Sequence, residues 1–248
     1  MTVLEGAFLI ATGIFAGFIN TIAGGGSLIT LPLLIFLGLP SAEANASNRV
    51  AIFVQNIFSV AGFQSKGVRI FPFAVWVAIP ATIGAIVGSK IAVDINEDVF
   101  NKILAVIMLM VMGITVFKPN VKKEASEMLT TKKVWLSVII FFFLGVYGGF
   151  IQAGVGFLII ASLTAIHGFK MAKTNAIKVF VALTYTVAAL VVFYLSDKIR
   201  WEYGLVLAVG NATGGWIASR WSVEKSDKLI RMILLVMVVA LSIKLWFF

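Results

Sequence analysis

The stretch GIFAGFINTIAGGGSLITLPL, from Gly13 to Leu33, decides the fold. It holds no charged residue, and Gly24, Gly25 and Gly26 divide it into two apolar segments. At membrane depth, backbone that is not helical must face protein or a water-filled cavity, because lipid offers it no hydrogen bonds. The stretch therefore predicts a membrane helix that breaks inside the protein and restarts after the glycines.

Composition places the rest of the chain in the bilayer as well. The 248 residues are 60% hydrophobic and 12% charged, with a mean hydropathy of +1.05, whereas soluble domains are about a quarter charged. The absence of cysteine excludes disulfides, thiolate metal sites and cysteine nucleophiles. The net charge of +9 fits Lys and Arg in cytoplasmic loops and does not call for a nucleic-acid partner. We expect an all-α polytopic membrane protein in contact with lipid.

The two halves of the chain resemble each other. Shifts of 132 and then 130 residues align glycines and amides in a steady register. The aligned pairs are Gly13 with Gly145, Asn20 with Gln152, Gly24 with Gly156, Asn45 with Asn175 and Gly84 with Gly214. We predict a first transmembrane repeat over 1–117, a cytoplasmic linker over 118–133 and a second repeat over 134–248. Each repeat has five hydrophobic segments, of which the first two are short or broken.

An odd number of segments inverts the second repeat relative to the first. The resulting topology puts six of the 20 Lys and Arg residues on one side and 14 on the other. The richer side is cytoplasmic by the positive-inside rule, so both termini are predicted outside a multi-pass cell-membrane protein. Inverted repeats with broken helices are typical of secondary transporters.

The first candidate site is the glycine break and its counterpart in the second half. Free N–H groups and the positive end of the restarting helix suit a small anion. The predicted binding residues here are Asn20, Gly24, Gly25, Gly26, Ser27 and Gln152. The glycines upstream, Gly13 with Gly17 and Gly145 with Gly149, have the spacing of tight helix packing.

The second candidate site combines amides and cations near the start of an apolar segment in each half. Its residues are Asn45, Asn48, Arg49, Asn175 and Lys178. Guanidinium and ammonium groups suit a sulfonate, sulfite or carboxylate. The alternative is that the asparagines cap helices and the cations are loop charges that follow topology.

Other polar residues in the spans are expected to bond across helices rather than to touch a substrate. They are Gln55, Asn56, Thr184, Tyr185, Asn211 and Thr213. The lone histidine, His167, is expected at a loop or cap, and no residue cluster has the spacing of a metal site. We therefore expect no catalytic residues, cofactor or metal. A coupling ion, H⁺ or Na⁺, and an oligomeric state do not follow from the sequence.

Gly13–Leu33, GLPSAEANASNRV from Gly38 to Val50, and GVYGGFIQAGVGF from Gly145 to Phe157 together resemble the sulfite exporter TauE/SafE family. The resemblance covers essentially the whole chain, although the second glycine run is shorter than family members often have. It implies a transporter of sulfite or an organosulfonate that works by alternating access and is not an enzyme. Two alternatives stay open at this point: an anion channel, and a membrane-embedded enzyme such as a lipid phosphatase.

Overall fold

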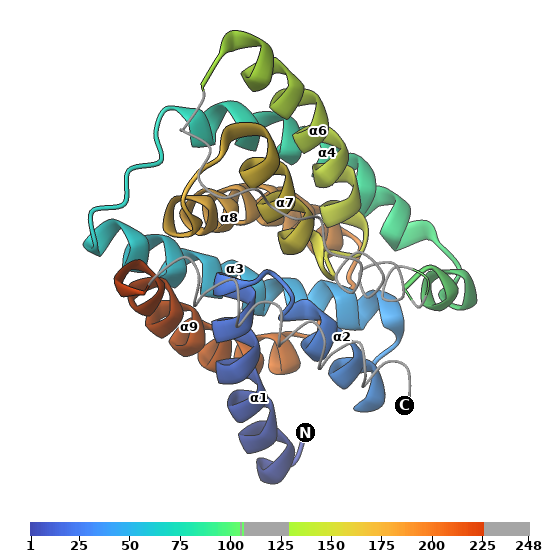
Figure 1. Ribbon diagram of the computed structural model, residues 1–248. Coiled ribbons are helices and arrows are strands. Elements are labelled where there is room, and N and C mark those ends of the chain that lie inside the picture. Colours follow the sequence, from blue (N-terminus) through green and yellow to red (C-terminus); the bar gives the residue numbers. More distant parts are fainter. Residues whose placement is uncertain (105, 107–128, 226–248) are drawn as a thin grey trace.

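The computed structural model describes residues 1–104, 106 and 129–225, and the regular structure of this part of the chain is α-helical (Figure 1). The helices are α1 (Val3–Ile22), α2 (Ser27–Phe36), α3 (Ser41–Ser65), α4 (Phe73–Asp94), α6 (Thr131–Phe150), α7 (Val155–His167), α8 (Met171–Leu195) and α9 (Trp201–Glu224). Most of the predicted segment 103–117, the predicted segment 232–248 and most of the predicted linker 118–133 lie outside the described residues. The boundaries of the predicted repeats therefore stay predictions.

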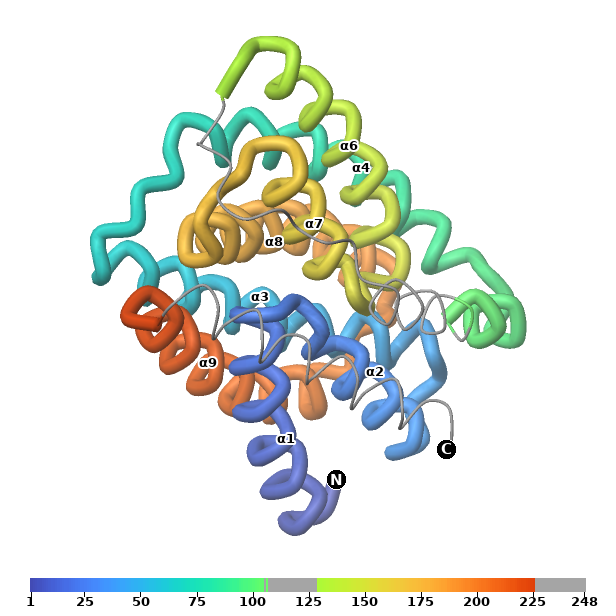
Figure 2. The backbone as a smooth tube through the Cα atoms, viewed as in Figure 1, coloured from blue at the N-terminus to red at the C-terminus, as the bar shows by residue number. Residues whose placement is uncertain are grey.

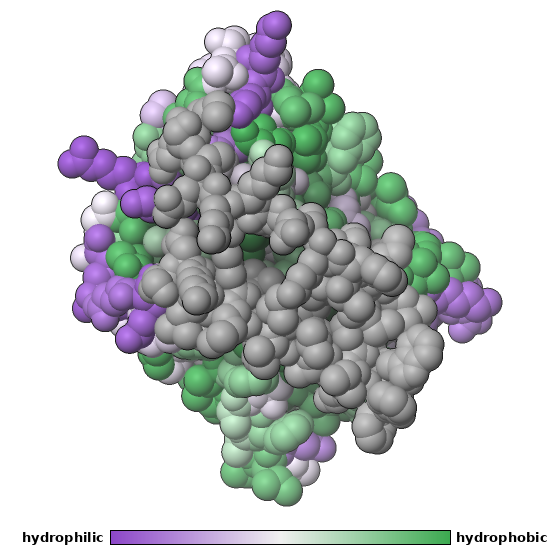
Figure 3. All heavy atoms as spheres, in the orientation of Figure 1, coloured by the Kyte–Doolittle hydropathy of each residue, from purple (hydrophilic) through white to green (hydrophobic). Residues whose placement is uncertain are grey.

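Four helices in the described part of the chain are long and apolar enough to cross a membrane: α1, α4, α6 and α8. Their outward faces carry large apolar side chains such as Phe15, Trp76, Phe143 and Val191. On the face shown in Figure 3, hydrophobic residues cover the upper right and the lower part, and hydrophilic residues gather at the top, along the left side and at the right end. This is the distribution of a membrane protein, with polar residues where helices meet water.

Two helices begin earlier than their apolar segments predict. The expected spans start at Val50 and Val179, but α3 begins at Ser41 and α8 at Met171. The expectation was wrong because polar residues were assigned to segment ends. Inside the protein these side chains have hydrogen-bond partners, so helix can continue through them.

The helices pack as two bodies, which Figures 1 and 2 show one above the other. The first body consists of α1, α2, α3 and α9, and the second of α6, α7, α8 and α4. Helix α9 comes from the second half of the sequence and α4 from the first. Each half therefore lends its fourth helix to the other body, and α3 meets α8 between the bodies.

Glycines let the exchanged helices approach closely. On α1, a Cβ added to Gly13 or Gly17 would collide with the backbone of α9 around Asn211. On α6, a Cβ added to Gly145 or Gly149 would collide with the backbone of α4 at Ala81 or Ala85. The packing interpretation of these four glycines is confirmed, and the same contact is made in both bodies.

We predict that Gly17→Ala destabilises the protein. The new Cβ would lie 2.8 Å from Asn211 Cα, and overpacking of this kind costs roughly 1–3 kcal/mol. Gly6→Ala in the same helix is the control, because its Cβ would meet nothing nearer than 3.6 Å. The melting temperature in detergent is measured from the loss of monodisperse protein. It should drop for Gly17→Ala and stay the same or rise for Gly6→Ala. Equal melting temperatures would contradict the close α1–α9 contact.

Candidate functional site

The breaks in the two halves lie against each other at the centre of the protein. Gly24 has a φ of +89° and Gly154 a φ of +76°, values that L side chains rarely adopt. A Cβ on Gly24 would overlap the backbone of Gly156, and a Cβ on Gly156 would overlap that of Gly24. The N-termini of α2 and α7 therefore begin side by side, and their positive dipole ends meet.

A small cavity adjoins this meeting point. Its volume is about 20 Å³, which is enough for about one water molecule. Its polar lining residues are Asn20, Ser27, Asn56, Gln152, Lys178 and Tyr185. Both bodies contribute to this lining, since the first three residues come from α1 to α3 and the others from the α6–α7 break and α8.

Several donors at the cavity have no partner within the described part of the chain. Asn56 Nδ2 and Tyr185 Oη are unpaired although each residue is only 1% exposed. The backbone N–H groups of Ser27 and Gly156, at the starts of α2 and α7, donate to no backbone carbonyl in the described residues. Unpaired buried donors are costly, and these four groups are available to donate to an acceptor in the cavity.

Arg49 closes the C-terminal end of α6. Its guanidinium donates to the carbonyls of Gly148 and Gly149 at 2.9 and 2.7 Å, and to Gln152 Oε1 at 2.8 Å. Asn45, one turn earlier on α3, donates its Nδ2 to the carbonyl of Phe150 at 2.8 Å. A helix that ends inside the protein leaves its last carbonyls without partners. Asn45 and Arg49 donate the missing hydrogen bonds.

Lys178 closes α1 in the same way. Its Nζ donates to the carbonyls of Asn20 and Thr21 at 2.8 and 2.7 Å, and to Asn175 Oδ1 at 3.1 Å. Asn175 Nδ2 donates to the carbonyl of Ile22 at 3.1 Å. We call these two arrangements, Asn45 with Arg49 and Asn175 with Lys178, the cation clasps. Each joins a helix of one body to the helix end of the other.

The clasps correct the alternatives that the sequence left open. Arg49 is fully buried and Lys178 is 3% exposed, so neither is a loop charge. Asn45 and Asn175 do cap helices, but at the C-terminus of a distant helix and not at the N-terminus of their own. Asn48 belongs to neither clasp, because its Oδ1 accepts from Thr30 Oγ1 at 2.7 Å and ties α3 to α2.

The predicted site residues thus separate into two groups. Asn20, Ser27, Gln152 and Lys178 line the cavity, while Arg49 reaches it through Gln152. The other predicted residues do not line the cavity. The three glycines permit close packing of the break, and Asn45, Asn48 and Asn175 hold helices in place.

Asn56 and Tyr185 differ from what their sequence context predicts. Both were expected to bond across helices, but Asn56 Nδ2 and Tyr185 Oη have no partner in the described part of the chain. Gln55 does bond across helices, since it accepts from Asn20 Nδ2 at 3.2 Å. A single polar residue in an apolar span looks the same in both cases, so no signal in the sequence separated them.

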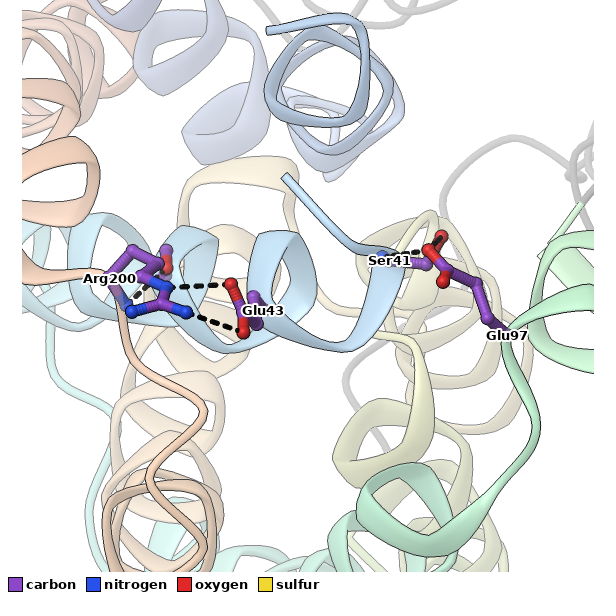
Figure 4. A network of polar contacts seen from close by, with 5 residues as sticks. Ser41, Glu43, Glu97 and Arg200 are labelled. Carbon is purple, nitrogen blue, oxygen red and sulfur yellow. Dashed lines mark hydrogen bonds and ion pairs between the residues drawn. The ribbon is translucent and has the colours of Figure 1, made fainter. Parts of the chain in front are cut away.

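Polar contacts outside the cavity fix the beginning of α3 (Figure 4). Arg200, just before α9, donates to both carboxylate oxygens of Glu43 at 2.7 and 2.9 Å. This hydrogen bond and the charge of Glu43 raise the pKa of Arg200. Ser41 donates its backbone N–H to Glu97 at 2.9 Å. Being solvent-exposed, the Arg200–Glu43 pair orients α3 against α9 more than it stabilises the fold.

Comparison with known proteins decides the family. The family described as "Sulfite exporter TauE/SafE" matches residues 9–245. The chain belongs to this family. Its glycine break, its clasps and its cavity all lie within the matched range, so the resemblance expected from Gly13–Leu33 is confirmed for nearly the whole TauE/SafE chain.

Relatives of this TauE/SafE chain are similar along most of their length. A Sinorhizobium protein named "Probable membrane transporter protein ORF9" is 26% identical, over 96% of this chain and 91% of its own. A Haemophilus influenzae "Probable membrane transporter protein" is 27% identical over 96% and 93%. The Escherichia coli "Probable membrane transporter protein YfcA" is 27% identical over 96% and 88%. No solved structure matches significantly. The protein is a membrane transporter of the TauE/SafE family.

We predict that Arg49→Ala is strongly destabilising even without substrate. It leaves the carbonyls of Gly148 and Gly149 and the Gln152 amide oxygen without their donor, and each unpaired group costs roughly 1–3 kcal/mol. Arg220→Ala is the matched control, because Arg220 is exposed and stacks on Trp216, a contact worth about 1 kcal/mol or less. The melting temperature of each variant in anion-free detergent checks both expectations. Only a small decrease for Arg49→Ala would contradict the structural role of the clasp.

Proposed function

We propose that this protein is a secondary transporter that moves a small anion, sulfite or an organosulfonate, across the cell membrane by alternating access. The observation that carries the proposal is the cavity where α2 and α7 begin. Unpaired donors face it, and Lys178 lines it. Anions bind at helix N-termini because free N–H groups and the dipole both favour negative charge.

The substrate-binding residues in this proposal are those at the cavity. Asn20, Ser27, Gln152, Asn56 and Tyr185 contact the anion, together with the backbone around the Gly24–Gly26 break. Arg49 and Lys178 supply positive charge from the clasps, and Asn45, Asn48 and Asn175 keep those cations in place. Sulfite and sulfonate groups carry several acceptor oxygens, which matches donors that come from α2, α3, α7 and α8.

The proposal includes an inverted repeat. The order long helix, break, short helix and two long helices occurs twice, as α1 to α4 and as α6 to α9. The clasps are reciprocal, since α3 closes α6 and α8 closes α1. Removing the buried Arg49 and Lys178 from the charge count takes one cation from each side. The remaining excess of Lys and Arg on the predicted cytoplasmic side therefore still favours a multi-pass cell-membrane protein with both termini outside.

The size of the cavity and the two bodies support alternating access. A cavity for about one water is smaller than an anion of four or more heavy atoms, so in this proposal the bodies separate for loading. The cavity lies between them and α3 meets α8 there. Rocking of one body against the other exposes the same residues to either side in turn, as in other transporters with repeated halves.

Transport is tested with purified protein in liposomes loaded with sulfite or sulfoacetate. A carrier accelerates uptake of labelled sulfite when unlabelled anion is inside, which is counterflow. Flux that follows the gradient without counterflow would identify a channel. Absence of any sulfur-anion flux or binding would overturn the proposal.

We predict that Tyr185→Phe weakens sulfite transport without weakening the fold. Oη has no partner among the described residues, so its loss breaks no hydrogen bond there. A hydrogen bond to a charged ligand is worth about 1.5 kcal/mol or more, hence about a tenfold or greater rise in KM. Tyr147→Phe is the opposite control, because Tyr147 Oη donates to the carbonyl of Ala153 and its loss lowers the melting temperature. A Tyr185→Phe protein with normal KM would place the anion elsewhere.

A further inference from the structure

We propose that the site selects divalent oxyanions over monovalent ones of the same size. This inference rests on the proposed function and narrows its substrate class from sulfur anions in general to dianions such as sulfite. It is argued from the charge that the protein buries around the cavity.

Lys178 is held as an ammonium group. Its Nζ has three acceptors, the carbonyls of Asn20 and Thr21 and Asn175 Oδ1, at 2.8, 2.7 and 3.1 Å. All three are oxygens that can only accept here, since Asn175 donates with its Nδ2 to Ile22. A neutral amine has two N–H groups, so three acceptors require the protonated form.

Arg49 adds a second full charge, which reaches the cavity through Gln152. Its partners are carbonyl and amide oxygens, none of them a carboxylate. No Asp or Glu is buried within the described ranges. A guanidinium stays charged in proteins, so two positive charges are buried around the cavity with no opposite charge between them.

Helix dipoles do not remove this excess. The C-termini of α1 and α6 at the clasps contribute about −0.5 charge each, and the N-termini of α2 and α7 contribute about +0.5 each. These four partial charges cancel, and the charge of Arg49 and Lys178 remains. A monoanion neutralises half of it and a dianion neutralises all of it, a difference that matters in a region of low dielectric.

The unpaired donors point to the same ligand. Asn56 Nδ2 and Tyr185 Oη are buried, and the N–H groups of Ser27 and Gly156 are unpaired as well. Four donors need several acceptor oxygens on one small ion. Sulfate offers four oxygens where a sulfonate of the same shape offers three, and sulfite spreads two negative charges over three oxygens where a sulfonate spreads one.

The test compares sulfate with methanesulfonate, which have nearly the same tetrahedral shape and differ by one oxygen and one charge. Binding to the purified full chain is measured by titration calorimetry, and both ions are offered as competitors of labelled sulfite in liposomes. We expect sulfate to bind about tenfold or more tightly than methanesulfonate, which is about 1.4 kcal/mol. Equal affinity, or preference for methanesulfonate, would overturn the inference and leave the proposed function standing. Binding of neither ion, with no sulfite flux, would count against the function itself.

Two pairs of variants assign the preference to charge. Lys178→Met should bring the sulfate to methanesulfonate ratio close to one, and Lys178→Arg should keep it. Asn56→Asp places a carboxylate at the cavity with little change in shape and should likewise abolish the preference. Asn56→Leu removes the same donor without adding charge and should weaken both ions while keeping the ratio. The ratio is read within each variant, so partial loss of folded protein does not affect it. A ratio unchanged in both Lys178→Met and Asn56→Asp would contradict the charge argument.

Discussion

A helix that ends inside a bilayer must find donors for its last carbonyls, because no water is there to supply them. This protein ends two helices at depth, α1 and α6, and much of its interior answers that need. Arg49 and Lys178 are buried where they can reach those carbonyls, and Asn45 and Asn175 cover the ones that the cations miss. The same break that creates the need also opens α2 and α7, whose N-termini attract the opposite charge. One constraint therefore accounts for both the buried cations and the donors at the cavity.

The two halves depend on each other through that constraint. Each clasp takes its cation from one body and its carbonyls from the other, and each body includes a helix borrowed from the opposite half of the sequence. Each body is closely packed through glycine contacts such as Gly17 with Asn211, and the clasps are polar contacts between the bodies. This arrangement suits the proposed alternating access, in which the bodies move without losing their own packing.

The sequence was most informative where the structure is local. The break after Ala23 and the packing role of Gly13 and Gly17 could be predicted because glycine runs and glycine spacing act on neighbouring backbone. The clasps could be located but not explained, because Arg49 and Lys178 meet carbonyls 99 and 157 residues away. Helix starts at Ser41 and Met171 were missed for the same reason: a polar run reads as a loop until its distant partners are known. Asn56 and Tyr185 each carry a buried donor without a partner in the described part of the chain, which no pattern within a helix records.

The exchange of α4 and α9 has a consequence for biosynthesis. When the ribosome has finished the first half, α1 lies in the membrane with its glycine stripe uncovered and its last carbonyls without donors. The residue that completes that end, Lys178, is translated only 157 positions after Thr21, and the helix that covers the stripe follows later still. α4 in turn must wait for α6. The nascent first half therefore lacks its packing and hydrogen-bond partners, and the insertion machinery has to protect it until the second half is translated.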